Sequence, residues 1–122
     1  MATQHVKWQY PAVIAINESL SQPVHLNNNT LVGLIVPGEW TPANITFQGS
    51  VDGTNWFNLL DADGVELTVI VSLGSPATAT WFVFPAGAFH GIEFIRFRSG
   101  TRATAVNQVA ARTLTAILRG FE

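Results

Sequence analysis

Apolar and polar residues alternate along most of this chain, in short runs rich in β-branched and aromatic side chains. Alternation with a period of two places successive side chains on opposite sides of a β-strand, so each run predicts a half-buried strand. The runs recur about every 8–12 residues, a spacing typical of all-β domains. Strands are expected over residues 6–16, 22–26, 31–36, 45–50, 56–60, 65–71, 80–84, 92–98 and 113–119.

Turn-forming residues separate these runs. They include Asn27-Asn28-Asn29, Asp52-Gly53, Asp63-Gly64 and Ser99-Gly100. Asn, Asp and Gly are favoured in turns because their backbones tolerate positive φ or their side chains bond nearby backbone groups. The Asp52-Gly53 pair therefore predicts a tight hairpin that joins the strand at 45–50 to the strand at 56–60 as neighbours.

Eight or nine short strands predict two packed sheets, because one sheet of that size would leave an apolar face uncovered. The expected fold class is all-β: an antiparallel two-sheet β-sandwich of the jelly-roll type with 8–9 strands. Alternation places Ile95 and Phe97 in its core and points Arg96 and Arg98 outward. The same rule predicts further core positions at Ile45, Phe47, Leu114, Ala116 and Leu118.

The 122 residues have the size of one domain. Pro11 lies in a strand-like segment, and proline cannot donate to a sheet ladder, so residues 1–11 are expected to be an N-terminal arm or edge strand. Residues 12–122 are then the single jelly-roll domain. Charged residues make up 11% of the chain and apolar residues 48%. This balance predicts a surface of uncharged polar groups, partly covered by another subunit.

The composition also argues against several classes of partner and site. The net charge is −2 and the cationic residues form no block, so no nucleic-acid partner is expected. No apolar run approaches the ~20 residues that cross a bilayer, so no membrane partner is expected and the chain is predicted to be soluble. Without cysteine there is no disulfide, thiolate metal site or thiol nucleophile. No secretory signal is recognised near the N-terminus, which predicts synthesis in a cytoplasm.

Residues that could carry acid–base or nucleophilic chemistry are scattered. His5, His25 and His90 lie far apart in different contexts, and none has a partner at metal-ligand spacing. We therefore interpret them as loop or surface histidines. The serines lack a Gly-x-Ser-x-Gly setting, so no nucleophile is indicated. The prediction is a protein that is not an enzyme and that uses no cofactor.

The segment DADGVE offers the one acidic cluster, with carboxylates at Asp61, Asp63 and Glu66. Alternating acidic positions before a glycine are similar to the opening of a calcium-binding loop. No acidic residue stands at the expected end of such a loop, and Asp-x-Asp-Gly is a common hairpin turn. A turn is therefore favoured, and no metal site is expected.

The aromatic residues could stack on sugar rings or fill the core and an interface. Trp56, directly after the predicted hairpin, is expected in the core, whereas Trp40 lies in a proline-flanked loop and is expected to be exposed. An N-terminal arm that added a strand to a neighbouring subunit would bury Val6, Trp8 and Tyr10. The interaction candidates are therefore Val6, Trp8, Tyr10 and Trp40.

The run ANITFQGSVDGTNWFNLL, followed by GIEFIRFRSG and RTLTAILRG, resembles small β-sandwich proteins encoded among the head and structural genes of tailed bacteriophages. This resemblance covers most of the chain after about Leu31. The pattern Ser-x-Asp-Gly-x-x-Trp, with the later Arg-x-Arg-Ser-Gly, is also similar to discoidin-like jelly-roll modules, which bind sugars or lipids through loops at one end.

The phage resemblance implies a capsid cement or decoration protein, which sits as an oligomer over joints between hexamers of the major capsid protein. The expected function is thus that of a non-enzymatic structural protein of the virion. Its expected partners are its own copies, as a dimer or trimer, and the major capsid protein. The alternative is a carbohydrate-binding module of a phage fibre or tail, which would recognise host surface glycans through Trp40 and other loop aromatics.

Overall fold

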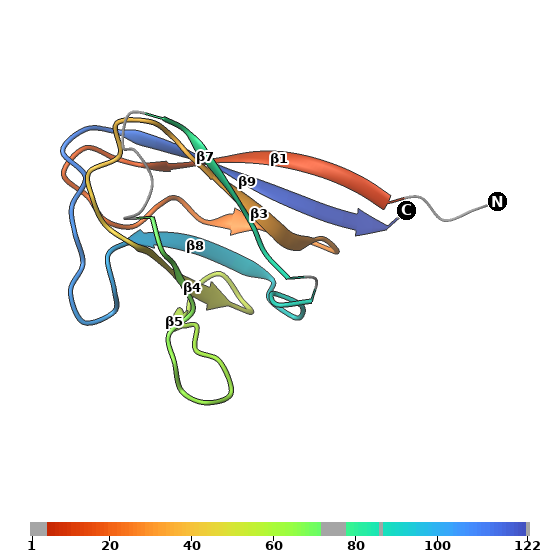
Figure 1. Cartoon of the computed structure of the whole chain (residues 1–122). Helices are drawn as coiled ribbons and strands as arrows, with labels where there is room; N and C mark the ends of the chain where they lie inside the picture. Colours follow the sequence, from red (N-terminus) through yellow and green to blue (C-terminus); the bar gives the residue numbers. More distant parts are fainter. Residues whose placement is uncertain (1–4, 72–77, 86, 122) are drawn as a thin grey trace.

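The computed structural model describes residues 5–71, 78–85 and 87–121, and in these residues it contains strands and turns but no helix. The two layers of a β-sandwich are visible in Figure 1. All nine predicted strands are present, several of them shorter than predicted. They are β1 (His5–Ile14), β2 (Val24–His25), β3 (Thr30–Val36), β4 (Ile45–Ser50), β5 (Phe57–Asn58), β6 (Thr68–Val69), β7 (Thr80–Val83), β8 (Phe94–Ser99) and β9 (Arg112–Phe121).

The strands form two antiparallel sheets. The first sheet has the order β1-β9-β3-β7, and the second has the order β2-β8-β4-β5, with β6 also paired to β4. Strands that follow one another in sequence therefore mostly lie in opposite sheets, which is the connectivity of a jelly-roll. The predicted two-sheet sandwich is confirmed.

The core lies between the two sheets, and the predicted alternation decides which residues reach it. Ile95 and Phe97 of β8 are fully buried, and Ile45 and Phe47 of β4 lie opposite Ser99 and Phe97 in the register. The Phe47 ring packs edge-on against the rings of Phe84, Phe89 and Phe97, with centroid distances of 5.9, 5.1 and 5.8 Å. The predicted inward positions are confirmed, including Leu114, Ala116 and Leu118 of β9.

Strand β1 runs through Pro11 without a break and pairs with β9 along its whole length. It is an edge strand of the first sheet, so the missing N–H of Pro11 removes no essential ladder bond. Residues 5–11 and 12–14 belong to one strand. β1 therefore belongs to the sheet of its own chain. The arm hypothesis had placed it on a neighbouring subunit.

The connection between β4 and β5 confirms the predicted neighbours but differs from a tight hairpin. β4 and β5 pair antiparallel, and Gly53 has the expected positive φ of 79°. The loop is longer than a two-residue hairpin turn, and hydrogen bonds to the Asp52 side chain hold its backbone. The Asp52 carboxylate accepts hydrogen bonds from the backbone N–H groups of Thr54 and Asn55, both at 2.8 Å, and from the side chains of Asn55 and Ser50.

These hydrogen bonds hold the pKa of Asp52 well below its ordinary value of 3.8, the bond from the Asn55 backbone most of all. A lowered pKa in the folded state means that the carboxylate stabilises the fold at pH values above about 3.8, and that this stabilisation is lost as the pH falls below that value.

Asp52→Asn should therefore lower the urea midpoint at neutral pH, and the difference in urea midpoint between this variant and the wild type should become smaller in acid. Asp63→Asn, at another exposed loop carboxylate, is the control. A gap that stayed constant with pH would contradict this account of the loop.

No helix in the described ranges is long and apolar enough to span a membrane.

Candidate functional site

The outer face of the first sheet, turned away from the core, is defined by the strand register. Residues directly opposite each other in adjacent strands point to the same side. Ile35 of β3 lies opposite Trp81 of β7 and Thr115 of β9, and Gly33 lies opposite Val83 and Ile117. The described side chains that the register places on the outer face are those of Gln9, Pro11, Val13, Thr30, Ile35, Trp81, Val83, Thr113, Thr115, Ile117 and Arg119, with Gly33 between them.

Trp81 and Val83 make one end of this face apolar and exposed. The Trp81 side chain is 56% exposed and that of Val83 is 77% exposed. Trp81 lies across Gly33, because a Cβ built on Gly33 would be 2.7 Å from the indole Nε1. Because Gly33 has no side chain, the indole ring of Trp81 can lie against the sheet surface. This contact holds a large exposed ring in one position.

Strand β7, which carries both residues, also ends the sheet. In the described part of the chain β7 pairs with β3 on one side, and its other edge has no partner strand. The strand reads TWFV and holds no charged residue. Charges on edge strands commonly prevent pairing with other chains, so this edge lacks a usual protection against self-association.

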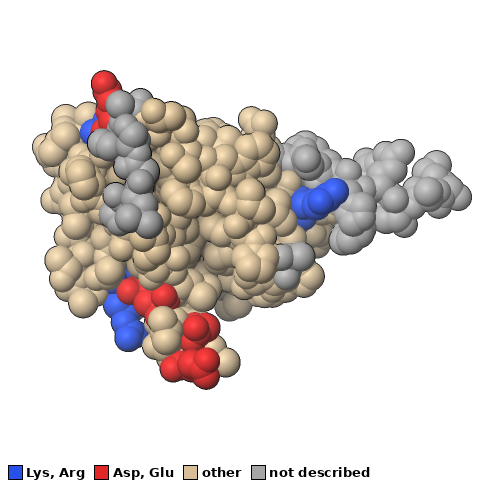
Figure 2. All heavy atoms as spheres, in the orientation of Figure 1, with Lys and Arg blue, Asp and Glu red and all other residues tan. Residues whose placement is uncertain are grey.

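Charged side chains are sparse on the side from which β7 is seen. Figure 2 shows Lys, Arg, Asp and Glu near the margins of this view, while its middle is formed by other residues. The side seen in this view therefore shows few charged side chains among the described residues. Uncharged surfaces with exposed aromatic side chains are typical of the cores of protein–protein interfaces.

Of the four residues expected to make contacts, the structure describes the side chains of Tyr10 and Trp40. Tyr10 is 47% exposed and lies opposite Ala116 in the β1–β9 ladder. Val6 and Trp8 pair with Gly120 and Leu118 in the same ladder, and their side chains lie outside the described structure.

Trp40, expected to be exposed, is buried with 2% of its surface accessible, so this prediction is wrong. Its Nε1 donates to the carbonyl oxygen of Ala43 at 3.0 Å, which satisfies the indole inside the loop. The loop is held inward by Gln108, which is fully buried. The Gln108 side-chain amide accepts from the N–H of Thr41 at 2.9 Å and donates to the carbonyl of Thr41 at 3.1 Å. Sequence reasoning did not single out Gln108, because a glutamine in a loop shows no pattern.

Trp56, expected in the core, is partly exposed, and the guanidinium carbon of Arg96 lies 4.3 Å from the centre of its ring. This prediction is also wrong, since Trp56 lies in the loop before β5 and stacks on the outside of the second sheet. Trp81 is exposed, although sequence reasoning did not select it as an interaction candidate. The alternation in TWFVF separates Trp81 and Val83 from Phe82 and Phe84, but does not tell which pair faces solvent.

The acidic segment DADGVE forms the predicted turn. The Asp61 carboxylate accepts from the N–H groups of Asp63 and Val65 at 2.8 and 3.0 Å. Glu66 lies beyond the turn and binds Arg98, with 2.7 Å between Oε2 and Nη2. Across the described ranges, no three His, Asp or Glu side chains are grouped in a way that would hold a metal ion.

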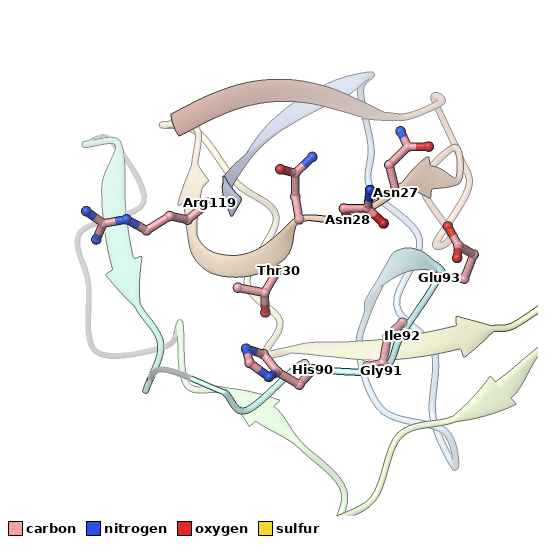
Figure 3. A pocket seen from close by; sticks show the side chains of 9 residues that line it. Asn27, Asn28, Thr30, His90, Gly91, Ile92, Glu93 and Arg119 are labelled. Carbon is pink, nitrogen blue, oxygen red and sulfur yellow. The ribbon is translucent and has the colours of Figure 1, made fainter. Parts of the chain in front are cut away.

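A polar cleft opens at one end of the sandwich, where the turn before β3 faces the turn before β8. It has a volume of about 360 Å³ and is lined by Asn27, Asn28, Asn29, Thr30, His90, Gly91, Ile92, Glu93 and Arg119. Figure 3 shows the Thr30 hydroxyl directed toward the His90 ring across this opening. His25 lies beside the cleft, where it stacks on Phe94 and contacts Glu93.

Comparison of the chain with protein-family models, with curated proteins and with solved structures finds no match.

Proposed function

We propose that this chain is a non-enzymatic structural protein of a phage virion, a capsid decoration protein that associates with its own copies and binds the major capsid protein. The assignment to a phage head is supported by the sequence resemblance. The assignment to a self-associating protein is supported by the outer face of the first sheet. The observation that carries it is the pair of ordered, exposed apolar side chains, Trp81 and Val83, on an uncharged edge strand.

Copies of the chain would associate through these side chains because removing apolar surface from water is favourable. Burying apolar surface contributes about 25 cal/mol per Å², and tryptophan is among the residues that most often dominate binding energy. Trp81 is already held against Gly33, so binding loses little side-chain freedom. A second copy that paired with the free edge of β7 would cover both side chains and satisfy the outward backbone groups of that strand.

The titratable side chains support a structural role as well. Arg98 is buried and bound to Glu66, and Asp52 is occupied by backbone donors of its own loop. His25 contacts Glu93 at the surface. Each of these groups is already bonded to other groups of the chain, so each has a role in the fold without any substrate.

Val83→Lys tests the self-association. The side chain is 77% exposed, so the fold should tolerate lysine, whereas a charge inside the proposed contact should weaken self-association by about tenfold or more. Light scattering coupled to size-exclusion chromatography, over a series of concentrations, measures the effect. Val109→Lys, at a valine that is 66% exposed in the loop before β9, is the matched control and should leave the mass unchanged. A wild-type protein that stays monomeric at the highest concentration would overturn the proposal.

Binding to the head is tested separately. Heads of the source phage, assembled without this protein, should bind the purified chain on co-sedimentation and then resist heating better than bare heads. Val83→Lys should reduce this protection if the oligomer is the binding form. Heads that neither bind the chain nor gain resistance would reject the decoration role while leaving self-association standing.

The alternative of glycan recognition rested on an exposed Trp40 and on other loop aromatics. Since Trp40 is buried, that residue no longer supports the alternative.

A further inference from the structure

The chain contains two Asp-Gly pairs, Asp52-Gly53 and Asp63-Gly64, and both lie in exposed loops. At such a pair the aspartyl side chain can react with the main chain, because the glycine has no side chain to hinder its N–H group. Both glycines have a positive φ, 79° for Gly53 and 82° for Gly64. The two pairs are therefore alike in sequence and in glycine conformation, and they differ in the hydrogen bonds that hold them.

Hydrogen bonds hold both reacting groups of the Asp52-Gly53 pair. The Gly53 N–H donates to Oγ of the buried Ser50 at 2.8 Å. Asp52 Oδ1 accepts from the N–H groups of Thr54 and Asn55, and Oδ2 accepts from the Asn55 side-chain amide. These bonds, with the Asn55 backbone bond as the largest cause, hold the pKa of Asp52 well below its ordinary value. The carboxyl group therefore stays ionised, and a carboxylate is a poor target for attack by an amide nitrogen.

The Asp63-Gly64 pair is less constrained. The hydrogen bonds to a carboxylate in this turn go to Asp61, at 2.8 and 3.0 Å, and among the described residues none reaches the carboxylate of Asp63. The Gly64 N–H donates to the carbonyl oxygen of Asp61 at 3.0 Å, a bond that water can replace because the turn is exposed. All residues from 61 to 65 are exposed, so the turn can open without uncovering the core. The Asp63 carboxyl group and the Gly64 nitrogen can therefore meet.

We propose that Asp63 is a site of isoaspartate formation in the folded protein and that Asp52 is protected from the same reaction. The Gly64 nitrogen loses its proton and bonds to Cγ of Asp63, the Cγ–OH bond breaks, and one water molecule leaves as a succinimide ring forms. Water then adds to one of the two ring carbonyl groups. Addition at Cγ restores aspartate, whereas addition at the main-chain carbon leaves Gly64 joined through Cγ, which is isoaspartate. One water leaves and one returns, so the mass is unchanged and no oxidant is needed.

Isoaspartate in this turn would lengthen the main chain by one carbon atom. The Asp61 N–H closes the turn on the carbonyl oxygen of Val65 at 2.8 Å, and Glu66 follows directly. Glu66 carries the carboxylate that binds Arg98, with 2.7 Å between Oε2 and Nη2. A longer turn displaces Glu66 relative to Arg98, so the modification is expected to weaken this buried pair and lower the urea midpoint.

Peptide mapping by mass spectrometry tests the site. The whole folded chain is kept for several weeks in mildly acidic heavy-oxygen water at physiological temperature, so that each hydrolysis of a succinimide adds one heavy oxygen atom. Label should enter Asp63 at least about tenfold faster than Asp52, as expected when hydrogen bonds must break before a reaction. In concentrated guanidinium chloride the two rates should become similar, because only the local sequence then acts. Absence of label at Asp63, equal rates in the folded chain, or an undiminished difference in denaturant would overturn the proposal.

Two variants separate protection from its consequence. Ser50→Ala removes the acceptor of the Gly53 N–H, so it should raise the labelling rate at Asp52 and leave that at Asp63 unchanged. Asp63→Glu, whose longer side chain closes an imide ring far more slowly, should abolish labelling at this position and prevent the fall in urea midpoint that the wild type shows during storage. An unchanged rate at Asp52 in Ser50→Ala would contradict the protection, and an equal fall in Asp63→Glu would contradict the link to Glu66. None of these measurements depends on self-association.

Discussion

Replacing Phe47 with alanine should lower the free energy of unfolding by about 3–5 kcal/mol, the range measured for phenylalanine truncations in protein cores. Phe47 is 1% exposed and lies at the centre of the sandwich. Its ring contacts Phe84 and Phe89 from the segment after β7, and Phe97 from the neighbouring strand β8. Alanine would leave a cavity that these rings cannot close without moving both sheets. Urea denaturation followed by tryptophan fluorescence measures the change.

Phe57→Ala is the control for this prediction. Phe57 is a phenylalanine on the adjacent strand β5, but it is 64% exposed, so its removal should change the free energy of unfolding by no more than about 0.5–1 kcal/mol. Because domains of this size are stable by about 5–15 kcal/mol, Phe47→Ala could unfold the protein outright. Phe47→Leu, which leaves a smaller cavity, should then show an intermediate loss. Equal losses for the Phe47 and Phe57 variants would contradict the packing described for the core.

Replacing Glu66 with glutamine should cost about 3 kcal/mol, because it leaves the Arg98 cation buried without a counter-charge. The side chains of Arg98 and Glu66 are 8% and 13% exposed, and 2.7 Å separates Nη2 from Oε2. The other guanidinium nitrogens donate to Asn58 Oδ1 at 2.9 Å and to Thr46 Oγ1 at 3.0 Å. These neutral acceptors cannot replace the lost charge, so urea denaturation should show a lower midpoint.

Two comparisons make the Glu66 prediction specific. Asp63→Asn removes an exposed carboxylate from the same connection and should change stability by less than about 0.5 kcal/mol. The double variant Glu66→Leu with Arg98→Met removes both charges, and it should be more stable than Glu66→Gln because no buried ion is left unpaired. A Glu66→Gln protein as stable as Asp63→Asn would show that water reaches Arg98 and that the pair contributes little.

Much of the fold could be predicted because strand alternation is a local property. Each side chain's face follows from its neighbours in sequence, so Ile95, Phe97, Leu114 and Leu118 were predicted inward and are buried. Turn chemistry is equally local, and Gly53 has the predicted positive φ. The candidate sites were less predictable. Whether an aromatic side chain is exposed depends on what another segment places over it, and that segment can be far away in sequence.

Trp40 and Arg98 are two examples of this dependence, one in a loop and one on a strand. Trp40 belongs to a loop that looked exposed, yet Gln108, 68 residues later, holds the loop at Thr41 and closes it over the indole. Arg98 lies on the outward side of β8, as predicted, yet it is 6% exposed because Glu66 and its connection cover it. Neither Gln108 nor Glu66 shows a sequence pattern that would reveal this role. Each is a single polar side chain, and the arrangement of the strands decides which residue it contacts.

By itself, the sequence determined a two-layered β fold, its nine strands and the inward side of the central ones, because period-two alternation and turn chemistry act between neighbours in the chain. Only the tertiary structure decided that Trp81 lies exposed over Gly33, that Trp40 is buried and that Thr30 and His90 face each other across a cleft. Those outcomes depend on which strands become neighbours and which strand is left at an edge. Such long-range packing follows from the free energy of the whole chain, and no short run of residues contains it.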